Sequence, residues 1–557
     1  MVKKLLFVLF LFAVTSAKAQ NYFFDDIQLM NEQKNKQLLG DSIHFNNKSF
    51  IIRSTSAYQY NLSVKRPKHK FFYINTIVAG YDFQNNSLLP VSYNDGNMFP
   101  SRGWQERYSV GANIHIGILD INFQPEKLTL ENKRQELFLG DMGNYWAKYY
   151  QIAANYTSHF RSFGNERIDT TTFGQTRVGI STKKIALGVS NQNLWWGPGS
   201  RNSLLMTNNA AGFKHLYINT NEPIKTSAGT FEFNAIVGTI DTTRYVDPDD
   251  SLMRTICPGC MVDKNINSRT IKAITVIWQP KWIPNFYLGY AYSKQYYDND
   301  STSLQKNTTF FPGDRKSTTI GSLYFRFLMP KDHLEFYGEI GQQNETPWLW
   351  NFFKKSNATA FIIGSRKLFP IKSNKSYIEL ELEFAQLQLM NPRLVFTPGD
   401  AVHSGPQVNS WYTSNIIRQG YTNNGQLLGA SIGPGSNSQT FGVAYHLGMN
   451  KIKYGFERVV NNNDFYHFNT INFIGAAPSG YYDRYYADVN HTIEIQIMPI
   501  KNFLFSASLI STNALNYRWI RRAEEIEANF LKPSPISDKQ NTRINLSFKY
   551  VLHGVIK

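Results

Sequence analysis

The sequence predicts an all-β membrane protein: a large antiparallel transmembrane β-barrel with a small N-terminal helical element. Three observations predict this fold. Apolar and polar residues alternate along many segments, short turns alternate with long polar loops, and Phe, Trp and Tyr make up 15% of the chain. Transmembrane barrels have short turns on one rim, long loops on the other and aromatic girdles at both membrane interfaces. A soluble β-sandwich also alternates, but it does not require that asymmetry between turns and loops.

The first residues predict export. Lys3 and Lys4 precede an apolar run from Leu5 to Val14, and Ala17-Lys18-Ala19 is a typical cleavage site. Residues 1–19 are therefore expected to be a cleaved signal peptide. No cysteine follows the cut, which argues against a lipoprotein anchor. We expect the mature chain to reside in the outer membrane of a Gram-negative cell.

The mature chain is expected to form two parts. Residues 20–65 form an N-terminal periplasmic segment that is partly helical, with the helix over residues 25–39. Residues 66–557 form the outer-membrane barrel, with a helical insertion near 130–163 that carries an aromatic stripe. The sequence contains no linker rich in Pro, Ser or charge that would divide residues 66–557, which favours a single barrel.

The barrel strands are clearest in the C-terminal half. Apolar residues at 378, 380, 382 and 384 alternate with Glu379, Glu381 and Glu383, which places the two sets on opposite faces of a strand. We expect the apolar set to face lipid and the three carboxylates to form a solvated row in the lumen. Short periplasmic turns are expected near 279–285, 329–332, 369–372, 448–450 and 498–502, and long external loops over 293–316, 342–358, 390–437 and 460–487.

The most specific motif begins with two adjacent tryptophans. Trp195-Trp196-Gly197-Pro198-Gly199 is followed by an apolar run and then by Asn208 and Asn209. Residues 197–200 are expected to form a type II turn, in which Gly199 has a positive φ. The tryptophan pair either packs in a core or binds a planar or sugar ligand. Packing is favoured because tryptophan buries a large area.

This stretch resembles the Wzi-like capsule assembly family, whose pattern runs Trp-Trp-Gly-Pro-Gly and then Ser-Leu-x-x-Ser-Asn-Asn-Ala. Thr207 stands where the family has its second serine. Tyr93–Met98 and Gly420–Gly429 resemble the Bacteroidetes-type branch of that family. The resemblance implies an eighteen-stranded outer-membrane barrel with a helical element on its periplasmic side. It also makes residues 195–199, 208 and 209 a family marker that is either structural or close to the ligand.

Aromatic residues in the long external loops are candidates for binding polysaccharide. Sugar rings stack their C–H faces on aromatic rings, while polar side chains bond the hydroxyl groups. An aromatic girdle at the membrane interface is an equally good interpretation. The candidate residues are Trp348, Trp350, Trp411, Tyr412, Arg418, Tyr421, Tyr481 and Tyr482.

The formal net charge of +17 favours acidic partners through long-range attraction. Export argues against nucleic acid, so acidic capsular polysaccharide and lipopolysaccharide fit better, together with the lipid of the outer membrane. A merely solvated excess of Lys and Arg is the alternative. Cys257 and Cys260, separated by Pro-Gly, are expected to form a disulfide at a loop tip. No nearby Cys or His completes a metal site with them.

No catalytic motif is present at the expected spacing. The sequence therefore predicts a non-enzymatic protein without a cofactor or metal. The resemblance implies binding of surface polysaccharide and a role in capsule or exopolysaccharide assembly or attachment. An outer-membrane channel or a substrate-specific transport barrel is the alternative, because the carboxylate row indicates a polar lumen.

Overall fold

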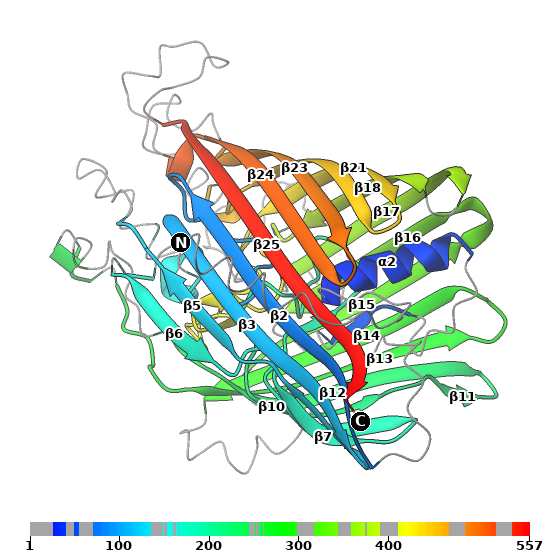
Figure 1. Ribbon diagram of the computed structural model, residues 1–557. Coiled ribbons are helices and arrows are strands. Elements are labelled where there is room, and N and C mark those ends of the chain that lie inside the picture. The colour runs from blue at the N-terminus through cyan, green and yellow to red at the C-terminus, as the bar shows by residue number, and fades with distance from the viewer. Residues whose placement is uncertain are drawn as a thin grey trace.

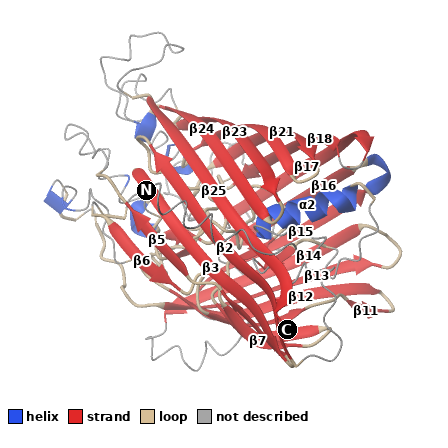
Figure 2. Ribbon diagram, viewed as in Figure 1, coloured by secondary structure: helices blue, strands red, loops and turns tan. Residues whose placement is uncertain are grey.

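The computed structural model is a closed antiparallel β-barrel whose interior holds a helix and several loops (Figure 1). It describes residues 26–40, 49–54, 71–134, 149, 153–159, 163–164, 166–243, 251, 254–255, 257–259, 261–297, 317–343, 358–373, 376–389, 410–466, 485–519 and 537–556. Strands form almost the whole wall, and helices are few (Figure 2).

Twenty-one hydrogen-bonded segments make up the wall, and they correspond to eighteen transmembrane strands because three of those strands are interrupted. This confirms the predicted fold class and the strand number implied by the family resemblance. The interrupted strands are β4 (Leu119–Phe123) with β5 (Glu126–Leu130), β6 (Ile168–Thr172) with β7 (Arg177–Ser181), and β10 (His215–Thr220) with β11 (Ile224–Thr226). The continuous strands are β2 (Phe72–Asn86), β3 (Gly103–Ile116), β8 (Ile185–Ser190), β12 (Gly229–Ile240), β13 (Arg269–Pro280), β14 (Phe286–Tyr297), β15 (Thr318–Met329), β16 (Leu334–Gln343), β17 (Ala358–Ser373), β18 (Ser376–Gln386), β21 (Asn437–Leu447), β22 (Asn450–Val460), β23 (Ala487–Ile500), β24 (Phe503–Leu515) and β25 (Lys539–Ile556).

The first and last strands of the wall close the barrel. β2 pairs with its neighbour β3 on one side and with the C-terminal β25 on the other, and both pairings are antiparallel. Asp82 of β2 lies in register with Arg107 of β3 and with Ser547 of β25, and it contacts both side chains. A closed wall leaves no sheet edge without hydrogen-bond partners, which a barrel in lipid requires.

Short turns lie at one end of the barrel, as predicted. Residues 281–285, 330–333, 448–449 and 501–502 connect successive strands at this end, while the long connections lie at the other. Each of these turns lies within or beside a predicted one. The turn predicted at 369–372 is not formed there, because Pro370 lies inside β17 beside a shift in register and the strand continues to Ser373. Proline cannot donate a ladder hydrogen bond, so a strand tolerates it at such irregular positions, as β23 tolerates Pro499.

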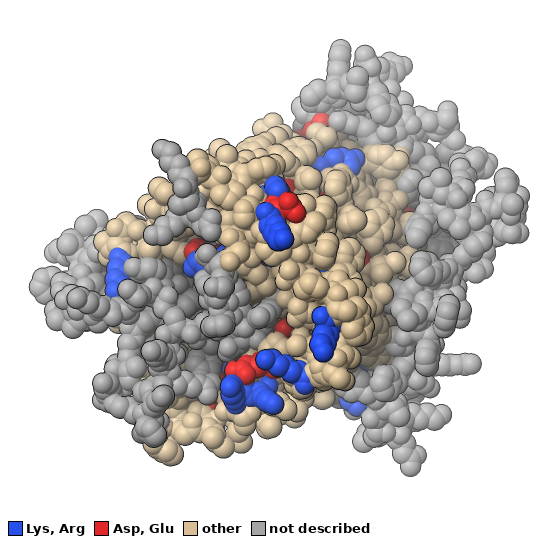
Figure 3. Space-filling model, turned by 90° about the vertical axis from the view of Figure 1, so that its right-hand side faces the viewer, with Lys and Arg blue, Asp and Glu red and all other residues tan. Residues whose placement is uncertain are grey.

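The outer surface of the wall is apolar. Ile378, Leu382 and Phe384 are each more than a third exposed, whereas Glu381 and Glu383 between them are buried on the inner face. The same outward apolar pattern recurs on β21 and β23, as lipid contact requires. Figure 3 shows the end with the short turns, where lysine and arginine side chains lie in several separate groups.

No helix in the described part of the chain is long and apolar enough to cross a membrane.

The interior contains elements that are not part of the wall. They are α2 (Asp26–Leu38), the two-stranded sheet of β1 (Ile52–Ser54) and β9 (Leu194–Trp196), and the two-stranded sheet of β19 (Thr422–Asn423) and β20 (Gln426–Leu427). α2 lies within the range expected for a helix. Short 3-10 turns occur at η3 (Ala154–Tyr156), η4 (Pro330–Asp332) and η6 (Tyr517–Trp519). Most of the helical insertion predicted near 130–163 lies outside the described residues.

A single large hydrophobic cluster joins these inner elements to the wall. It includes Leu38 at the C-terminal end of α2, Trp196 of β9, Leu204 after the motif and Trp411 from the loop between β18 and β21. Each of these four side chains is fully buried. Segments from both ends of the barrel therefore pack together inside it, and we call this packed interior the plug.

Candidate functional site

The tryptophan motif lies in the plug. β9 pairs with β1, and Trp196 stands opposite Ile52 in the register. The backbone N–H of Trp196 also donates to Met206 O at 3.2 Å, which folds the motif back on itself. Trp195 and Trp196 are 3% and 0% exposed. In this structure both rings are packed, and neither offers an open face to a ligand.

The expected type II turn after the tryptophans is not formed. Gly197, and not Gly199, has the positive φ, at 142°. A Cβ on Gly197 would collide with the Ser203 hydroxyl, and one on Gly199 would collide with the Asn202 carbonyl. Glycine is required at both positions because the backbone passes close to the following segment. The local turn signal is overridden by this tertiary packing.

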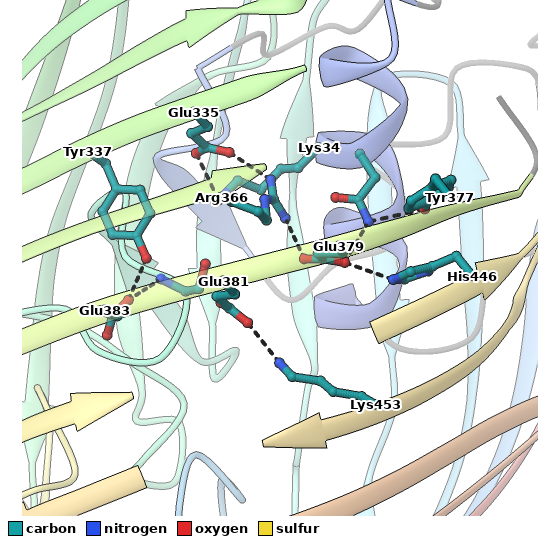
Figure 4. A network of polar contacts seen from close by, with 12 residues as sticks. Lys34, Glu335, Tyr337, Arg366, Tyr377, Glu379, Glu381, Glu383, His446 and Lys453 are labelled. Carbon is teal, nitrogen blue, oxygen red and sulfur yellow. Dashed lines mark hydrogen bonds and ion pairs between the residues drawn. The ribbon is translucent and has the colours of Figure 1, made fainter. Parts of the chain in front are cut away.

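The next residues enclose a single carboxylate from the barrel wall. Glu383 of β18 accepts the backbone N–H groups of Ser200 at 2.7 Å, Arg201 at 3.0 Å and Asn202 at 2.8 Å. The hydroxyl of Tyr337 also donates to it at 2.8 Å (Figure 4). A buried carboxylate needs this many donors, because an unpaired one would lose its hydration without compensation. Glu383 thereby fixes the path of the motif loop.

Further carboxylates on other strands hold the same loop. Glu339 of β16 accepts the backbone N–H of Leu204 at 3.1 Å and the Ser203 hydroxyl at 3.3 Å. Glu457 of β22 forms a bidentate pair with Arg201, at 2.9 and 3.1 Å. Three strands of the wall therefore anchor a loop of five residues. Such anchoring opposes release of the loop from the lumen, because each carboxylate would lose its donors together.

A second group of ion pairs connects the N-terminal helix to the wall. Glu335 of β16 lies 3.5 Å from Lys34 of α2 and 2.7 Å from Arg366 (Figure 4). It also lies 2.7 Å from Arg326. All four side chains are buried. Lys34 also donates to Pro198 O at 3.5 Å, so the helix and the motif are held by one side chain.

The predicted carboxylate row is on the inner face but is not solvated. Glu379 accepts from His446 at 2.8 Å, and Glu381 accepts from Lys453 at 2.7 Å. Glu383 is 1% exposed. The prediction of a wet row is wrong because neighbouring wall strands supply His446 and Lys453, and the plug covers the row and supplies backbone donors. His446, which looks isolated in the sequence, also stacks on Tyr377 with ring centroids 4.5 Å apart.

The sequence reasoning missed Glu335, Glu339 and Glu457 as anchors. A sequence pattern that marks them as inward-facing was present, because Glu335 and Glu339 alternate with outward apolar residues along β16 in the same way as the row on β18. An acidic residue on an inner face indicates either water or a buried partner. Local alternation alone does not distinguish the two.

We predict that Glu383→Gln lowers the free energy of unfolding by about 2–3 kcal/mol. The amide keeps one acceptor oxygen, but its NH2 group would face the backbone donors of the motif loop. The guanidinium midpoint of the refolded barrel measures the change. Glu494→Gln is the matched control: Glu494 also faces inward, but it pairs with Lys451 and is partly exposed. Equal effects of the two substitutions would contradict the anchoring role of Glu383.

The three motifs that carry the family resemblance meet in space. The backbone N–H of Gly96 donates to Asn208 O at 2.7 Å, and that of Thr207 donates to Leu428 O at 2.8 Å. The side chain of Asn209 donates to Leu427 O at 3.1 Å. Gln426 closes the arrangement by donating to Gly96 O and to Asn209 O. We call this meeting point the motif junction.

A pocket of about 70 Å³ lies at the motif junction, at the end of the barrel with the long loops. Its polar lining includes Asn209 and Gln426 from the junction and Asp488 at the start of β23. Its apolar lining includes Leu89 and Ile432. The complete lining is Leu89, Pro90, Val91, Ser92, Tyr93, Pro100, His159, Asn209, Gly425, Gln426, Ser431, Ile432, Val459, Asn461, Tyr486 and Asp488.

Three of the predicted sugar-binding aromatics are buried. Trp411 and Tyr412 are 0% exposed and Tyr421 is 2% exposed, and all three belong to the plug cluster. Tyr412 stacks on Tyr421 with centroids 5.8 Å apart. The expectation that these rings form an open stacking surface is therefore corrected: their loop folds into the barrel. Arg418 is partly exposed and lies over the Tyr156 ring.

The other four predicted sugar contacts, Trp348, Trp350, Tyr481 and Tyr482, lie outside the described residues. Cys257 is disulfide-bonded, and Cys260 also lies outside the described residues. In the part of the chain that the structure describes, no three His, Cys, Asp or Glu side chains group as metal ligands would.

A half-buried aspartate joins two segments of the long connection between β18 and β21 to the residues that follow β22. Asp464 accepts the backbone N–H of Leu389 at 2.8 Å and the Ser410 hydroxyl at 2.7 Å. Burial raises its pKa to about 6. The folded protein therefore binds this proton more tightly than the unfolded chain does. The stabilisation is complete below the ordinary pKa of an aspartate and is lost as the pH rises through about 6.

We predict that Asp464→Asn stabilises the barrel at pH 8 but not at pH 3.5. The amide keeps an acceptor for Leu389 and can donate to Ser410 without a charge. The gain at pH 8 is expected to be roughly 2 kcal/mol. Guanidinium unfolding of both proteins at the two pH values provides the measurement. A stability difference that does not change with pH would show that Asp464 ionises freely in the folded state.

The comparisons with known proteins agree on the fold. Residues 130–257, which include the tryptophan motif, match the family model described as capsule assembly protein Wzi. The matched family is the Wzi capsule assembly family. A solved structure of Wzi from Escherichia coli, described as an outer-membrane protein involved in group 1 capsule assembly and as a carbohydrate-binding β-barrel, covers 95% of this chain and 99% of its own, with a TM-score of 0.59 and 13% identity.

The Wzi barrel therefore shares its fold with this chain. A more distant barrel, OccK7 (OpdD) of Pseudomonas aeruginosa, covers 87% of this chain and 99% of its own at 7% identity, with a TM-score of 0.39. No curated protein matches the chain.

Proposed function

We propose that this chain is a Wzi-type outer-membrane barrel without enzymatic activity, which binds surface polysaccharide and assists capsule or exopolysaccharide assembly or attachment. One observation carries the proposal. The segment that matches the Wzi family model, residues 130–257, contains the motif loop that Glu383 and Glu339 lock inside the barrel. The match therefore includes the part that distinguishes this barrel from an empty pore, together with the neighbouring wall strands from β6 to β12.

The filled lumen supports a binding role over transport. The plug cluster contains Trp196, Leu204 and Trp411, each fully buried, and buried ion pairs secure it to the wall. A solute would have to displace this packing in order to cross. Polysaccharide would instead bind at the end with the long loops, with Trp348, Trp350, Tyr481, Tyr482 and Arg418 as the proposed contacts.

The partners and location follow from the same proposal. The apolar outer face of the wall fits lipid, and the net charge of +17 supports acidic polysaccharide and lipopolysaccharide as partners. Residues 1–19 would direct export to the outer membrane and be removed. Tyr93–Met98 and Gly420–Gly429, which meet at the motif junction, support placement in the Bacteroidetes-type branch.

A deletion strain tests the proposed function. We expect loss of the chain to release polysaccharide from the cell surface into the medium, and expression of the chain to restore the attached fraction. Quantifying cell-bound and free polysaccharide in both strains is sufficient. Unchanged cell-bound polysaccharide in the deletion strain would reject the role in attachment and assembly.

Conductance in planar bilayers tests the transport alternative. We predict no steady conductance from the purified full chain, because the plug fills the lumen. A large porin incorporated in the same bilayer is the positive control, since its water-filled barrel conducts. Steady, large conductance steps that scale with the amount of added protein would favour a channel.

A further inference from the structure

The polar lining of the pocket at the motif junction is held by internal hydrogen bonds. Gln426 donates to Gly96 O at 3.1 Å and to Asn209 O at 3.2 Å. The Asn209 side chain donates to Leu427 O, and Asn461 donates to the Asp488 carboxylate at 2.8 Å. Four polar side chains from four separate segments are thus fixed before any ligand arrives. A site fixed in this way loses little conformational freedom on binding.

The pocket also has an apolar lining. Leu89, Ile432 and Val459 belong to it, and each is at most 5% exposed. The lining is therefore mixed: it presents aliphatic carbon as well as amide and carboxylate groups. A ligand group that fits it must itself have an apolar end and a hydrogen-bonding end.

The charge of the lining contrasts with that of the whole chain. Asp488 carries a carboxylate, and the lining residues include no lysine or arginine. An acidic sugar group placed here would face Asp488 without a compensating guanidinium or ammonium group in the lining. The like charge would oppose binding. The net charge of +17 therefore does not determine what this pocket accepts.

The volume limits the ligand to a small group. Sites that enclose a whole small molecule typically measure roughly 300–1,000 Å³, and this pocket measures about 70 Å³. A substituent on a sugar ring is the appropriate size, with the ring itself outside.

We propose that this pocket binds the N-acetyl group of an amino sugar in the surface polysaccharide. This inference rests on the proposed function and specifies the sugar class. The acetamido N–H would donate to the Asp488 carboxylate, and the methyl group would pack against Ile432 and Val459. A hydroxyl group in the same place would leave the aliphatic lining without a contact. An ammonium group would pair with Asp488 but would be desolvated against aliphatic carbon.

Three trisaccharides with one backbone test the proposal on the purified full chain in detergent. Chitotriose, the chitosan trimer and cellotriose carry an acetamido, an ammonium and a hydroxyl group at the same ring position. Titration calorimetry should show chitotriose binding at least about tenfold more tightly than either of the others. Equal binding of cellotriose, tighter binding of the chitosan trimer, or no binding of chitotriose would each overturn the proposal.

Two variants locate the binding. Asp488→Asn removes the charged acceptor and Ser431→Phe fills the pocket, and each should weaken chitotriose binding at least about tenfold. Asp263→Asn, at an external position with an 85% exposed side chain, is the control and should bind chitotriose as the parent chain does. Heat-modifiable migration on gels verifies that every variant is folded. Chitotriose binding that survives Ser431→Phe in a folded barrel would overturn the pocket assignment.

Failure of the pocket inference is distinguishable from failure of the proposed function. Capsule attachment in the deletion strain is scored independently of any trisaccharide. A chain that restores attachment but shows no N-acetyl preference overturns the pocket inference and leaves the function standing. A deletion strain with unchanged attachment rejects the function even if chitotriose binds.

Discussion

Trp196→Ala is expected to lower the free energy of unfolding by about 3–5 kcal/mol, the range for removing a large aromatic side chain from a packed core. Trp196 is 0% exposed and lies between β1 and the segment at Met206 inside the barrel. The wall surrounds it on all sides, so the cavity cannot collapse freely. Guanidinium unfolding of the refolded barrel, followed by fluorescence, provides the measurement.

Trp282→Ala is the matched control, because it removes the same residue type from an exposed position instead of a buried one. Trp282 is 64% exposed on the turn between β13 and β14, where it contacts Trp278 with centroids 5.8 Å apart. Its removal is expected to cost about 1 kcal/mol or less, the scale of one aromatic pair. A Trp196→Ala barrel as stable as the Trp282→Ala barrel would refute the packed plug.

Glu335→Gln is expected to destabilise the barrel by about 3–5 kcal/mol, because it leaves buried cations without their counter-ion. Glu335 is the common partner of Lys34, Arg326 and Arg366, at 3.5, 2.7 and 2.7 Å. Arg326 also donates to Ser49 O at 2.8 Å, in the segment that leads into β1. Loss of the carboxylate therefore weakens two of the attachments of the N-terminal segment to the wall, those through Lys34 and Arg326.

The expected signature of Glu335→Gln is a pair of changes. The unfolding midpoint should fall, and protease should cleave the N-terminal segment sooner than in the parent chain. Asp263→Asn makes the same chemical change in a pair with Arg254 whose side chains are 85% and 46% exposed. Exposed pairs contribute about 0–1 kcal/mol, so that variant should behave as the parent does. A Glu335→Gln barrel with parental stability would mean that water, and not Glu335, solvates these cations.

The wall could be predicted from the sequence because its signals are local. Ile378 and Phe384 face outward with carboxylates between them, and this alternation depends only on the two-residue period of a strand. The turns at 281–285 and 448–449 likewise follow from Pro284 and Gly448, which interrupt the alternation between such strands. The turn predicted near Pro370 was displaced because proline predicts an interruption of the ladder but not the end of a strand.

The plug could not be predicted in the same way. Trp411, Tyr412 and Tyr421 have the composition of an exposed sugar-binding loop, and only contact with the other inner segments shows that they are buried. The same is true of Glu383, whose partners at 200–202 lie more than 180 residues away in the sequence. A polar loop that binds glycan outside the barrel and one that folds into it contain the same residue types.

The sequence by itself determined that apolar and polar residues alternate along barrel strands and that the short turns share one rim. It also determined that residues 195–209 form a specific motif. The tertiary structure alone decided where that motif lies. Trp196 became a core residue, Glu383 an anchor and Asn209 part of a pocket when segments distant in the chain met inside the wall. The physical reason is the separation along the chain between the residues that interact. Strand alternation is set by neighbours two residues apart, whereas burial of a loop depends on partners that only the closed barrel supplies.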